Sequence, residues 1–333
     1  MKQVNLGLIG LGEQGKVSLR NSLRLEGAKT VAVADLSQKA RRYAKGMGIK
    51  DVYANYDDLL KNDAVDAVVV SLPNFLHRDG AEKAAEAGKA ILLEKPLART
   101  VDEGKEILSA VRKNGVKLMM GYDMRFNPIL SNLYDGIKDG LFGSIKLAEV
   151  TNVSGGPFSP RSDHVGPVKV PSWWLDKELS GGGVLLDLGS HLIDLLSWYF
   201  GEVVHVECFL EHMFNLELED AATCVLKFKD GPVATAKVGW FSTDFLQSVQ
   251  VCGTAQNMLV QISPQSTSKI FWNGIARKFG LNKKDSNYLE LEHFVSSLQK
   301  DEQPQPSGDA GLYGLKVIDS AYKNAMKNSG LHT

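Results

Sequence analysis

Hydrophobic positions in the first part of the chain form short unbroken runs that alternate with stretches of helical spacing. The run Val4 to Ile9 stops at glycines, and Lys16 to Leu25 then repeats apolar positions with helical spacing. A second run, Thr30 to Ala34, ends at Asp35 and is followed by a helix-compatible stretch through Met47 and a short strand around Val52. Unbroken apolar strands are typical of a parallel sheet covered by helices on both faces. Residues 1–53 are therefore predicted to be βαβαβ.

The same alternation continues as far as residue 121. The helices predicted next are 56–61, 77–87 and 101–114, and the strands are 66–71, 90–93 and 117–121. This order predicts a doubly wound Rossmann domain of about six parallel strands, with residues 1–123 as its bounds.

After Pro128 the pattern changes to strands with alternating apolar positions that are joined by short turns. The predicted strands are 144–153, 203–211, 221–229, 232–241, 247–251 and 258–262, and the predicted helices are 184–200, 288–299 and 310–327. Strands in such close succession usually pair antiparallel. Residues 124–333 are therefore expected to form an α+β domain with an open, mainly antiparallel sheet, whose C-terminal helix can pack back on the first domain. The fold class is α/β.

Composition and charge exclude several classes of function. The formal net charge of −1 gives no electrostatic support for binding nucleic acid. Cys208, Cys224 and Cys252 are isolated and lack zinc-ligand spacing, so they are expected to be buried thiols in a reducing compartment. No apolar stretch approaches the length of a membrane span, and the chain opens on a strand-like run instead of a signal peptide. We expect a cytoplasmic protein without membrane or nucleic-acid partners.

The first chemical motif is the glycine triplet Gly10, Gly12 and Gly15, which follows a predicted strand and opens a predicted helix. In that context the first glycine makes a tight turn, the second lets the backbone approach a pyrophosphate, and the third lets helix pack on strand. The helix N-terminus then offers free N–H groups to the anion. Asp35 ends the second strand, where a carboxylate accepts hydrogen bonds from an adenosine ribose. The sequence predicts a dinucleotide site.

The identity of the dinucleotide depends on the residues around Asp35. A carboxylate at this position repels a 2′-phosphate and so favours NAD. Ser37, Lys39 and Arg41 follow closely and keep NADP as the alternative.

Glu94-Lys95-Pro96 directly follows the buried strand 90–93. Ligands of a doubly wound sheet bind beyond the carboxyl ends of its strands, so Lys95 is expected at the mouth of the cofactor crevice. The alternative is a solvated lysine before a turn proline.

Asp187, His191 and Asp194 interrupt the apolar stretch 184–200 at positions i, i+4 and i+7, which share one face of a helix. The alternative is a narrow solvent-facing stripe, although aspartate is a poor residue for the middle of a helix. We interpret His191 as a general base for a substrate hydroxyl, assisted by the two aspartates, with Lys95 stabilising the developing alkoxide. No metal-ligand cluster is apparent in the sequence, which disfavours a metal-assisted reaction.

A third polar segment, residues 122–128, follows the last Rossmann strand. Arg125 and Asn127 are candidates for binding substrate hydroxyls or a phosphate. Equally, Arg125 can pair with Asp123 or with another acid.

Five motifs in order make the chain similar to the Gfo/Idh/MocA family of oxidoreductases, which includes glucose–fructose oxidoreductase and inositol dehydrogenase. They are GLGEQG at 10–15, SLPNFLH at 71–77, EKPL at 94–97, RFNP at 125–128 and GGGVLLDLGSHLIDLL at 181–196. The resemblance covers nearly the whole chain. It implies Lys95, Asp187 and His191 as catalytic residues and Asp194 near the substrate. It also implies a homodimer or homotetramer formed through the C-terminal sheet, which fits the apolar residues on both faces of Ala234 to Phe241.

The resemblance, together with the motifs, defines two sets of expected binding residues. The cofactor set is Gly10, Leu11, Gly12, Glu13, Gln14, Gly15, Asp35, Leu36, Ser71, Leu72, Pro73, Asn74, His77, Glu94 and Lys95. The substrate set is Lys95, Tyr122, Met124, Arg125, Asn127, Asn152, Trp174, Asp187, His191 and Asp194. The expected reaction is hydride transfer between a secondary hydroxyl of a sugar, inositol or sugar derivative and the nicotinamide.

Two other functions stay open at this point, and a third match is treated as chance. The loop 154–174, with Arg161, His164 and Lys169, fits no one subfamily, and Gly121-Tyr122-Asp123-Met124 departs from the pattern of members acting on UDP-N-acetylglucosamine. This departure disfavours a UDP-sugar 3-dehydrogenase, which stays as one alternative, and a non-catalytic NAD-sensing protein is another. The spacing Tyr134 to Lys138 also matches a short-chain dehydrogenase, but the glycine spacing of that class differs and Gly136 weakens the helix.

Overall fold

The computed structural model describes residues 3–158, 170–242, 245–262, 267–272, 275–280 and 285–328. The chain divides into two compact units. Unit 1 comprises Met1–Phe126 and Lys284–Tyr313, and unit 2 comprises Asn127–Lys283 and Gly314–Thr333. The division falls just after the expected one at residue 123. It also assigns residues 284–313 to unit 1, whereas the sequence groups them with the second domain.

Unit 1 is built on a six-stranded sheet with the strand order β3-β2-β1-β4-β5-β6. Its strands are β1 (Val4–Ile9), β2 (Ala28–Ala34), β3 (Asp51–Tyr53), β4 (Ala67–Val70), β5 (Ala90–Glu94) and β6 (Leu118–Gly121). Neighbouring strands pair parallel throughout. The predicted Rossmann sheet is confirmed, and its strand order reverses between β1 and β4, the point where such sheets bind ligands.

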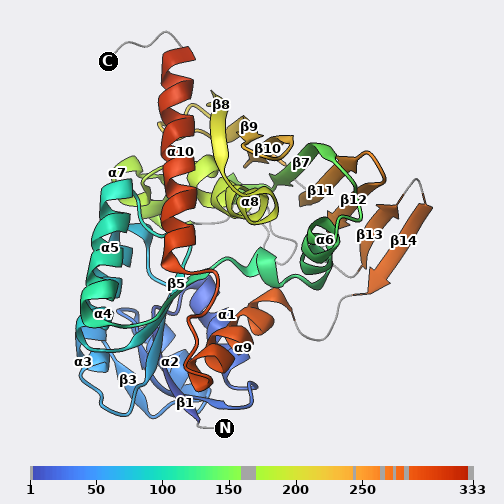
Figure 1. The fold of residues 1–333 in the computed structure, drawn as a ribbon. Coiled ribbons are helices and arrows are strands. Elements are labelled where there is room, and N and C mark those ends of the chain that lie inside the picture. Colours follow the sequence, from blue (N-terminus) through green and yellow to red (C-terminus); the bar gives the residue numbers. More distant parts are fainter. Residues whose placement is uncertain are drawn as a thin grey trace. The chain divides into compact units, whose positions relative to one another are not determined.

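The helices of unit 1 begin and end where local side chains favour it. They are α1 (Glu13–Ser22), α2 (Gln38–Gly46), α3 (Tyr56–Leu60), η1 (Asn74–Leu76), α4 (His77–Glu86), α5 (Val101–Asn114), η2 (Asp123–Phe126) and α9 (Ser286–Gln299), and α10 (Gly308–Asn328) begins in this unit (Figure 1). The Thr100 side chain caps α5 by accepting from Glu103 N, and Gly115 ends that helix with a positive φ. The predicted bounds of α5 match the structure.

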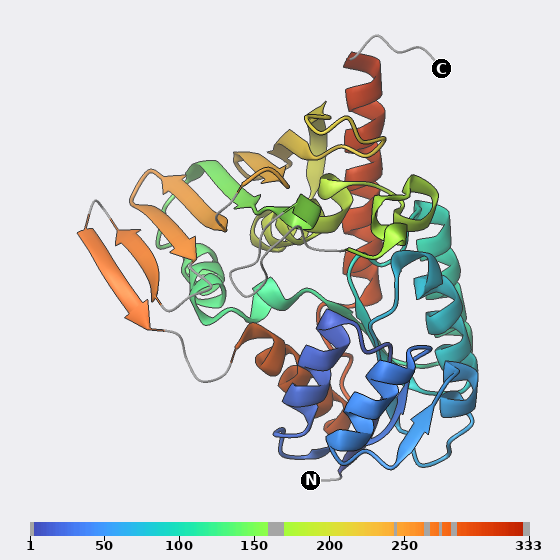
Figure 2. The ribbon, with the colours of Figure 1, turned by 180° about the vertical axis from the view of Figure 1, so that it is seen from behind.

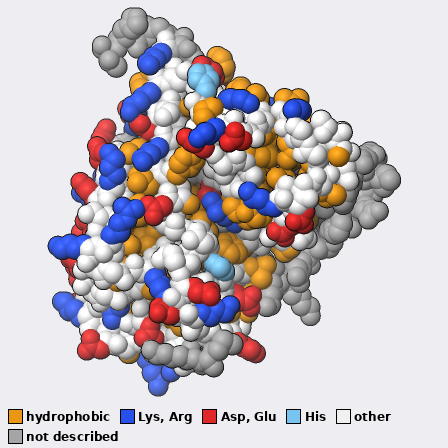
Figure 3. All heavy atoms as spheres, in the orientation of Figure 1, with side chains coloured by type: hydrophobic (Ala, Val, Ile, Leu, Met, Phe, Trp, Pro, Cys, Tyr) orange, Lys and Arg blue, Asp and Glu red, His pale blue; other side chains and the backbone are white. Residues whose placement is uncertain are grey.

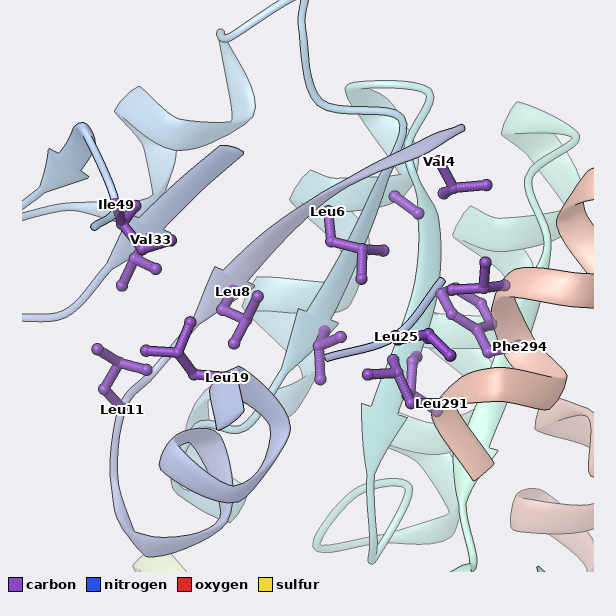
Figure 4. Packing of buried hydrophobic residues seen from close by; sticks show 14 of the residues in the cluster. Val4, Leu6, Leu8, Leu11, Leu19, Leu25, Val33, Ile49, Leu291 and Phe294 are labelled. Carbon is purple, nitrogen blue, oxygen red and sulfur yellow. The ribbon is translucent and has the colours of Figure 1, made fainter. Parts of the chain in front are cut away.

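Helix α9 belongs to the hydrophobic core of unit 1, which the sequence does not predict. Leu291 and Phe294 of α9 pack in one cluster with Val4, Leu6 and Leu25 (Figure 4). The periodicity of 288–299 predicts the helix but carries no information on which sheet it covers.

Unit 2 contains an eight-stranded sheet with the order β14-β13-β12-β11-β7-β10-β9-β8. Its strands are β7 (Ile145–Val153), β8 (Val203–Glu211), β9 (Ala221–Phe228), β10 (Val233–Gly239), β11 (Leu246–Gly253), β12 (Asn257–Ile262), β13 (Thr267–Trp272) and β14 (Ile275–Gly280). The pairings are antiparallel as expected, except that β7 and β10 run parallel. Asn152 therefore lies beside Val238, so the carboxyl ends of these two strands are adjacent.

The sequence misses β13, β14 and helix α6 (Pro128–Lys138). Lysine and arginine interrupt the alternation in 267–280, although these residues form the hairpin at one end of the sheet (Figure 2). Helix α6 forms despite Gly136 because Asn127 caps it and Pro128 occupies its first turn. Tyr134 stacks on Trp198 with ring centroids 4.1 Å apart, and Lys138 lies over the Tyr134 ring. This packing explains the Tyr134 to Lys138 spacing without a short-chain dehydrogenase site.

Helix α8 (Val184–Phe200) has the predicted bounds and packs against β7, β9 and β10. The other helices of unit 2 are η3 (Gly156–Phe158), η4 (Ser172–Leu175) and α7 (Lys177–Ser180). Contrary to expectation, Lys177–Phe200 is long and apolar enough to cross a membrane by length and composition. Because 72% of that window is buried inside the protein, it is the core helix of unit 2.

The sheet face opposite α8 is mixed in character. The β10 positions on this face include Thr235 and Lys237, and Lys237 Nζ lies 2.8 Å from Glu149. The expectation that Ala234 to Phe241 is apolar on both faces is therefore wrong. Leu147 (59% exposed), Phe209 (59%) and Val233 (38%) are among the exposed large apolar side chains on this face. In Figure 3 cationic and anionic side chains are interspersed over the surface in view.

Candidate functional site

The three glycines after β1 differ in what a side chain would meet. A Cβ on Gly10, whose φ is +88°, would collide with the Ser71 carbonyl, and one on Gly15 would collide with the Gly10 carbonyl. A Cβ on Gly12 would meet nothing within 4 Å. Gly12 is also the N-cap of α1, and as a glycine it has no side chain that could cap the first N–H groups of that helix. The first and third glycines thus satisfy packing, while the second leaves open space before a helix N-terminus, where an anion is favoured.

Asp35 connects this glycine turn to the end of β2. Its carboxylate accepts from Leu11 N at 2.6 Å and from Ser37 N at 2.7 Å. Arg41 Nη1 donates to the carbonyls of Asp35 and Leu36, both at 2.7 Å, and the Leu36 side chain is exposed. These bonds fix the carboxylate at the strand end where a ribose would bind.

The segment after β4 lies beside the glycine turn. Ser71 N donates to Ile9 O at 2.8 Å, and the Ser71 Oγ atom is buried without a hydrogen-bond partner among the described residues. Leu72 and Pro73 follow, and Asn74 begins η1. A buried hydroxyl without a hydrogen-bond partner needs an explanation, and at the place where the strand order reverses it fits the role of a group that faces a ligand.

The ring of His77, an expected cofactor residue, lies between two backbone carbonyls. Its Nδ1 lies 2.7 Å from Pro96 O and its Nε2 lies 2.9 Å from Leu72 O, and the ring is fully buried. Burial lowers the pKa of His77. Because both ring nitrogens face backbone carbonyls, the ring joins the Leu72 segment to the turn that carries Lys95.

Two acidic groups of unit 1, Glu94 and Asp123, interact with the charge of Lys95, and a third, Glu290, interacts with both of them. Glu94 ends β5, and burial raises the pKa of its carboxyl to about 7, although Lys95 opposes that rise. Burial also raises the pKa of Asp123, and it raises the pKa of Glu290 on α9 well above its usual range. The sequence gives no signal for Glu290, because no motif includes it.

The segment after β6, from which substrate-binding residues are expected, is largely buried or half-buried. Tyr122 and Met124 are buried, and Arg125 is partly exposed. Asn127 Oδ1 accepts from Ile129 N at 3.0 Å and from Leu130 N at 3.4 Å, so this oxygen caps α6. The structure therefore gives the Asn127 oxygen a structural role that the sequence does not predict.

The polar stripe on α8 lies within the apolar helix of unit 2. Asp187 and His191 are partly exposed, whereas Asp194 is only 3% exposed. A solvated stripe would not bury its last carboxylate, since a buried aspartate is costly without a role. A second buried acid, Glu219, lies at the start of this helix and accepts from Gly183 N, Leu185 N and Tyr322 Oη.

Polar and aromatic groups gather at the adjacent carboxyl ends of β7 and β10. Asn152 is buried, and its Oδ1 has no hydrogen-bond partner among the described residues. The same holds for the indole Nε1 of the buried Trp240, which follows β10. Trp174 packs edge-on against Trp240 with ring centroids 5.7 Å apart. Sequence reasoning finds Asn152 and Trp174 but misses Trp240, whose position depends on the parallel pairing.

The remaining points raised by the sequence are the polar residues of the loop 154–174 and metal binding. Arg161, His164 and Lys169 lie outside the described residues. Among the residues that are described, no group of three or more His, Cys, Asp or Glu side chains could hold a metal ion.

Comparison with known proteins identifies the family of both halves of the chain. Residues 4–122 match the oxidoreductase family with an NAD-binding Rossmann fold named GFO_IDH_MocA, and residues 132–258 match the GFO/IDH/MocA C-terminal domain. The chain belongs to the Gfo/Idh/MocA family. It is accordingly an NAD-binding oxidoreductase.

Individual relatives match along the full length. The chain is 27% identical to inositol 2-dehydrogenase of Rhizobium meliloti (strain 1021), covering 97% of each protein. It is 26% identical to 1,5-anhydro-D-fructose reductase of Ensifer adhaerens, covering 95% of each. In fold it is similar to levoglucosan dehydrogenase in complex with NADH and L-sorbose, with a TM-score of 0.87, 20% identity and 98% of each chain covered.

The glycine turn of this Gfo/Idh/MocA protein fits its cofactor. The open space at Gly12, the uncapped start of α1 and the fixed Asp35 carboxylate are the features that a pyrophosphate and an unphosphorylated ribose require. Residues of this turn would therefore hold NAD.

Proposed function

We propose that this protein oxidises a secondary hydroxyl of a sugar, inositol or sugar derivative, or reduces the corresponding ketone, with NAD as the preferred cofactor. The observation that carries the proposal is the Asp187, His191 and Asp194 stripe on an otherwise apolar core helix. The names of the inositol and anhydrofructose relatives support the substrate class. The orphaned polar atoms of Asn152 and Trp240 support it too, because a polyol offers both donors and acceptors.

The residue roles are proposed from their chemistry. His191 accepts the hydroxyl proton, and the neighbouring carboxylates of Asp187 and Asp194 stabilise the resulting imidazolium. Lys95 stabilises the developing alkoxide as a cation held at a strand end. The chemistry that a bound nicotinamide supplies is two-electron exchange with the carbinol carbon. Cofactor preference follows from Asp35, whose charge opposes a 2′-phosphate.

Replacing Lys95 by methionine tests this proposal. We expect turnover with the best substrate from a panel of inositols and sugars to fall about 10²- to 10⁴-fold, because the alkoxide loses its cation. NADH affinity, measured by fluorescence titration, should stay close to that of the unmodified protein. Lys113→Met, at an exposed lysine of the same unit, serves as the control.

Two results would reject parts of the proposal. Turnover of Lys95→Met equal to that of the control would remove Lys95 from the mechanism. If no substrate in the panel changed NADH absorbance while NADH still bound, a cofactor-sensing role would replace the enzymatic one.

We also propose that the protein acts in the cytoplasm as a homodimer or homotetramer, paired through the sheet face that carries Leu147, Phe209 and Val233. These exposed apolar side chains support the proposal, since large ones on one face favour association. Sedimentation velocity should show dimers or larger species, and Phe209→Glu should shift them towards monomer. Met47→Glu, at an exposed methionine of unit 1, should not. A monomeric wild-type protein at micromolar concentration would contradict the proposal.

A further inference from the structure

Three acidic side chains of unit 1 act on one another through their charges, and two of them also interact with the ammonium group of Lys95. Glu94 ends β5, Asp123 begins η2, and Glu290 projects from α9; these three residues are called the acid cluster below. The charge of Lys95 acts to lower the pKa of the Glu94 and Asp123 carboxyls. The charges of these two carboxyls act to raise the pKa of Glu290. Segments far apart in sequence therefore build one electrostatic site.

Amide side chains connect two members of the cluster. The Gln14 side chain hydrogen-bonds to Glu94, and Gln14 Nε2 also donates to Asn287 Oδ1. Asn287 Nδ2 in turn donates to Asp123 Oδ2 at 3.3 Å. Asn287 and Glu290 are three residues apart on α9 and so share one helix face. Glu94 and Asp123 consequently have donors that stabilise a carboxylate.

The hydrogen-bonding surroundings of Glu290 differ from those of Glu94 and Asp123. Its side chain is 3% exposed, and its Oε1 is buried with no hydrogen-bond partner among the described residues. An ionised carboxylate buried in this way, beside two other acids, would be very costly. A single ammonium, that of Lys95, cannot balance three negative charges, so one member of the cluster must be neutral.

We propose that Glu290 holds the proton of the acid cluster and acts as a positioning residue, leaving Glu94 as the group that changes charge beside Lys95. This inference rests on the proposed function of Lys95. It assigns α9 a part in catalysis that acts through Glu94.

The titration behaviour of the surrounding groups agrees with this assignment. Burial raises the pKa of Glu290 well above its usual range, and the charges of Glu94 and Asp123 raise it further. The pKa of Glu94 is raised to about 7, where Lys95 and the Gln14 bond limit the rise. Asp285, at the start of α9, adds to the raised pKa of Asp123. Glu94 therefore gains or loses its proton near neutral pH while Glu290 remains neutral.

Glu290→Gln tests the protonation state without requiring turnover. Between the unfolded pKa of a glutamate, about 4.3, and the raised native value, the folded protein binds one more proton than the unfolded chain. Wild-type stability therefore falls as pH rises through this range, and the glutamine variant lacks that loss. We expect the Tm of Glu290→Gln, relative to wild type, to rise by roughly 3 °C or more between pH 5 and pH 8.

Two further measurements complete this stability test. Infrared spectra should show a protonated carboxyl band in wild type that is missing from Glu290→Gln. Glu292→Gln, on the same helix and partly exposed, should show neither effect. Parallel Tm curves for Glu290→Gln and wild type, or an unchanged carboxyl band, would overturn the proposal.

The pH profile of kcat/KM tests the coupling to Lys95. Glu290→Leu removes a polar neighbour of Glu94, so the acid limb should move to higher pH by several tenths of a unit or more, and Glu290→Gln should largely restore it. An ionised Glu290 would give the opposite result, with the acid limb of Glu290→Gln moving to lower pH by about a unit. The Tm and infrared results do not depend on catalysis. A failure of Lys95→Met would therefore reject the proposed function separately.

Discussion

Glu219 in unit 2 and Glu290 in unit 1 are both buried glutamates, but their surroundings differ. Glu219 accepts from Gly183 N at 3.2 Å, Leu185 N at 3.0 Å and the Tyr322 hydroxyl at 2.7 Å. Glu290 Oε1 has no hydrogen-bond partner among the described residues, and the charges of two other acids, Glu94 and Asp123, act on its carboxyl. A buried carboxyl with a full set of donors stabilises the folded structure. A buried carboxyl oxygen without a donor lowers the stability of the fold, so its presence needs another explanation.

The three donors give Glu219 a defined task at the start of α8. A helix leaves its first N–H groups without partners, and Glu219 supplies acceptors to two of them from another segment. Burial raises the pKa of Glu219, and the hydrogen bonds oppose that rise. The acid thus anchors the helix that carries Asp187 and His191.

The largest effect is expected when Glu219 is replaced by leucine. Two backbone N–H groups and the Tyr322 hydroxyl would lose their acceptor inside the protein. We expect the free energy of unfolding of unit 2 to fall by about 3–5 kcal/mol, because each buried donor left unsatisfied costs roughly 1–3 kcal/mol. Urea denaturation followed by tryptophan fluorescence measures this change.

An exposed neighbour provides the control for this stability change. Glu217→Leu should alter the free energy of unfolding by less than about 0.5 kcal/mol. A loss below about 1 kcal/mol for Glu219→Leu would mean that water replaces the carboxylate and that the two buried glutamates are more alike than their contacts indicate.

The contrast also shows what could be predicted from the sequence. Elements with strong periodicity, such as α5, α8 and β8, have their predicted bounds, because local spacing determines them. The glycine turn could be predicted because its three constraints lie within six residues. Local pattern therefore finds the cofactor turn and the polar stripe on α8.

Features that depend on distant segments could not be predicted. Glu219 is 34 residues from Leu185 and 103 from Tyr322, and Glu290 meets Glu94 through a helix that the sequence groups with the other domain. The parallel pairing of β7 and β10, which brings Asn152 next to the strand that ends before Trp240, is equally non-local. Loop closure between such segments leaves no periodic signal in the sequence.

The smallest expected effect concerns the amide that supports Glu94. The hydrogen bond from Gln14 lowers the pKa of Glu94, so Gln14→Leu should raise that pKa above its value of about 7. Because a protonated Glu94 no longer balances the charge of Lys95, the acid limb of kcat/KM should move to higher pH by several tenths of a unit. The measurement uses saturating NADH, since Gln14 belongs to the cofactor turn. Gln3→Leu, at an exposed glutamine of unit 1, is the control. If the limb matched the control or moved to lower pH, the Gln14 hydrogen bond would not lower the pKa of Glu94. The difference between the acid cluster and Glu219 would then not lie in their donors.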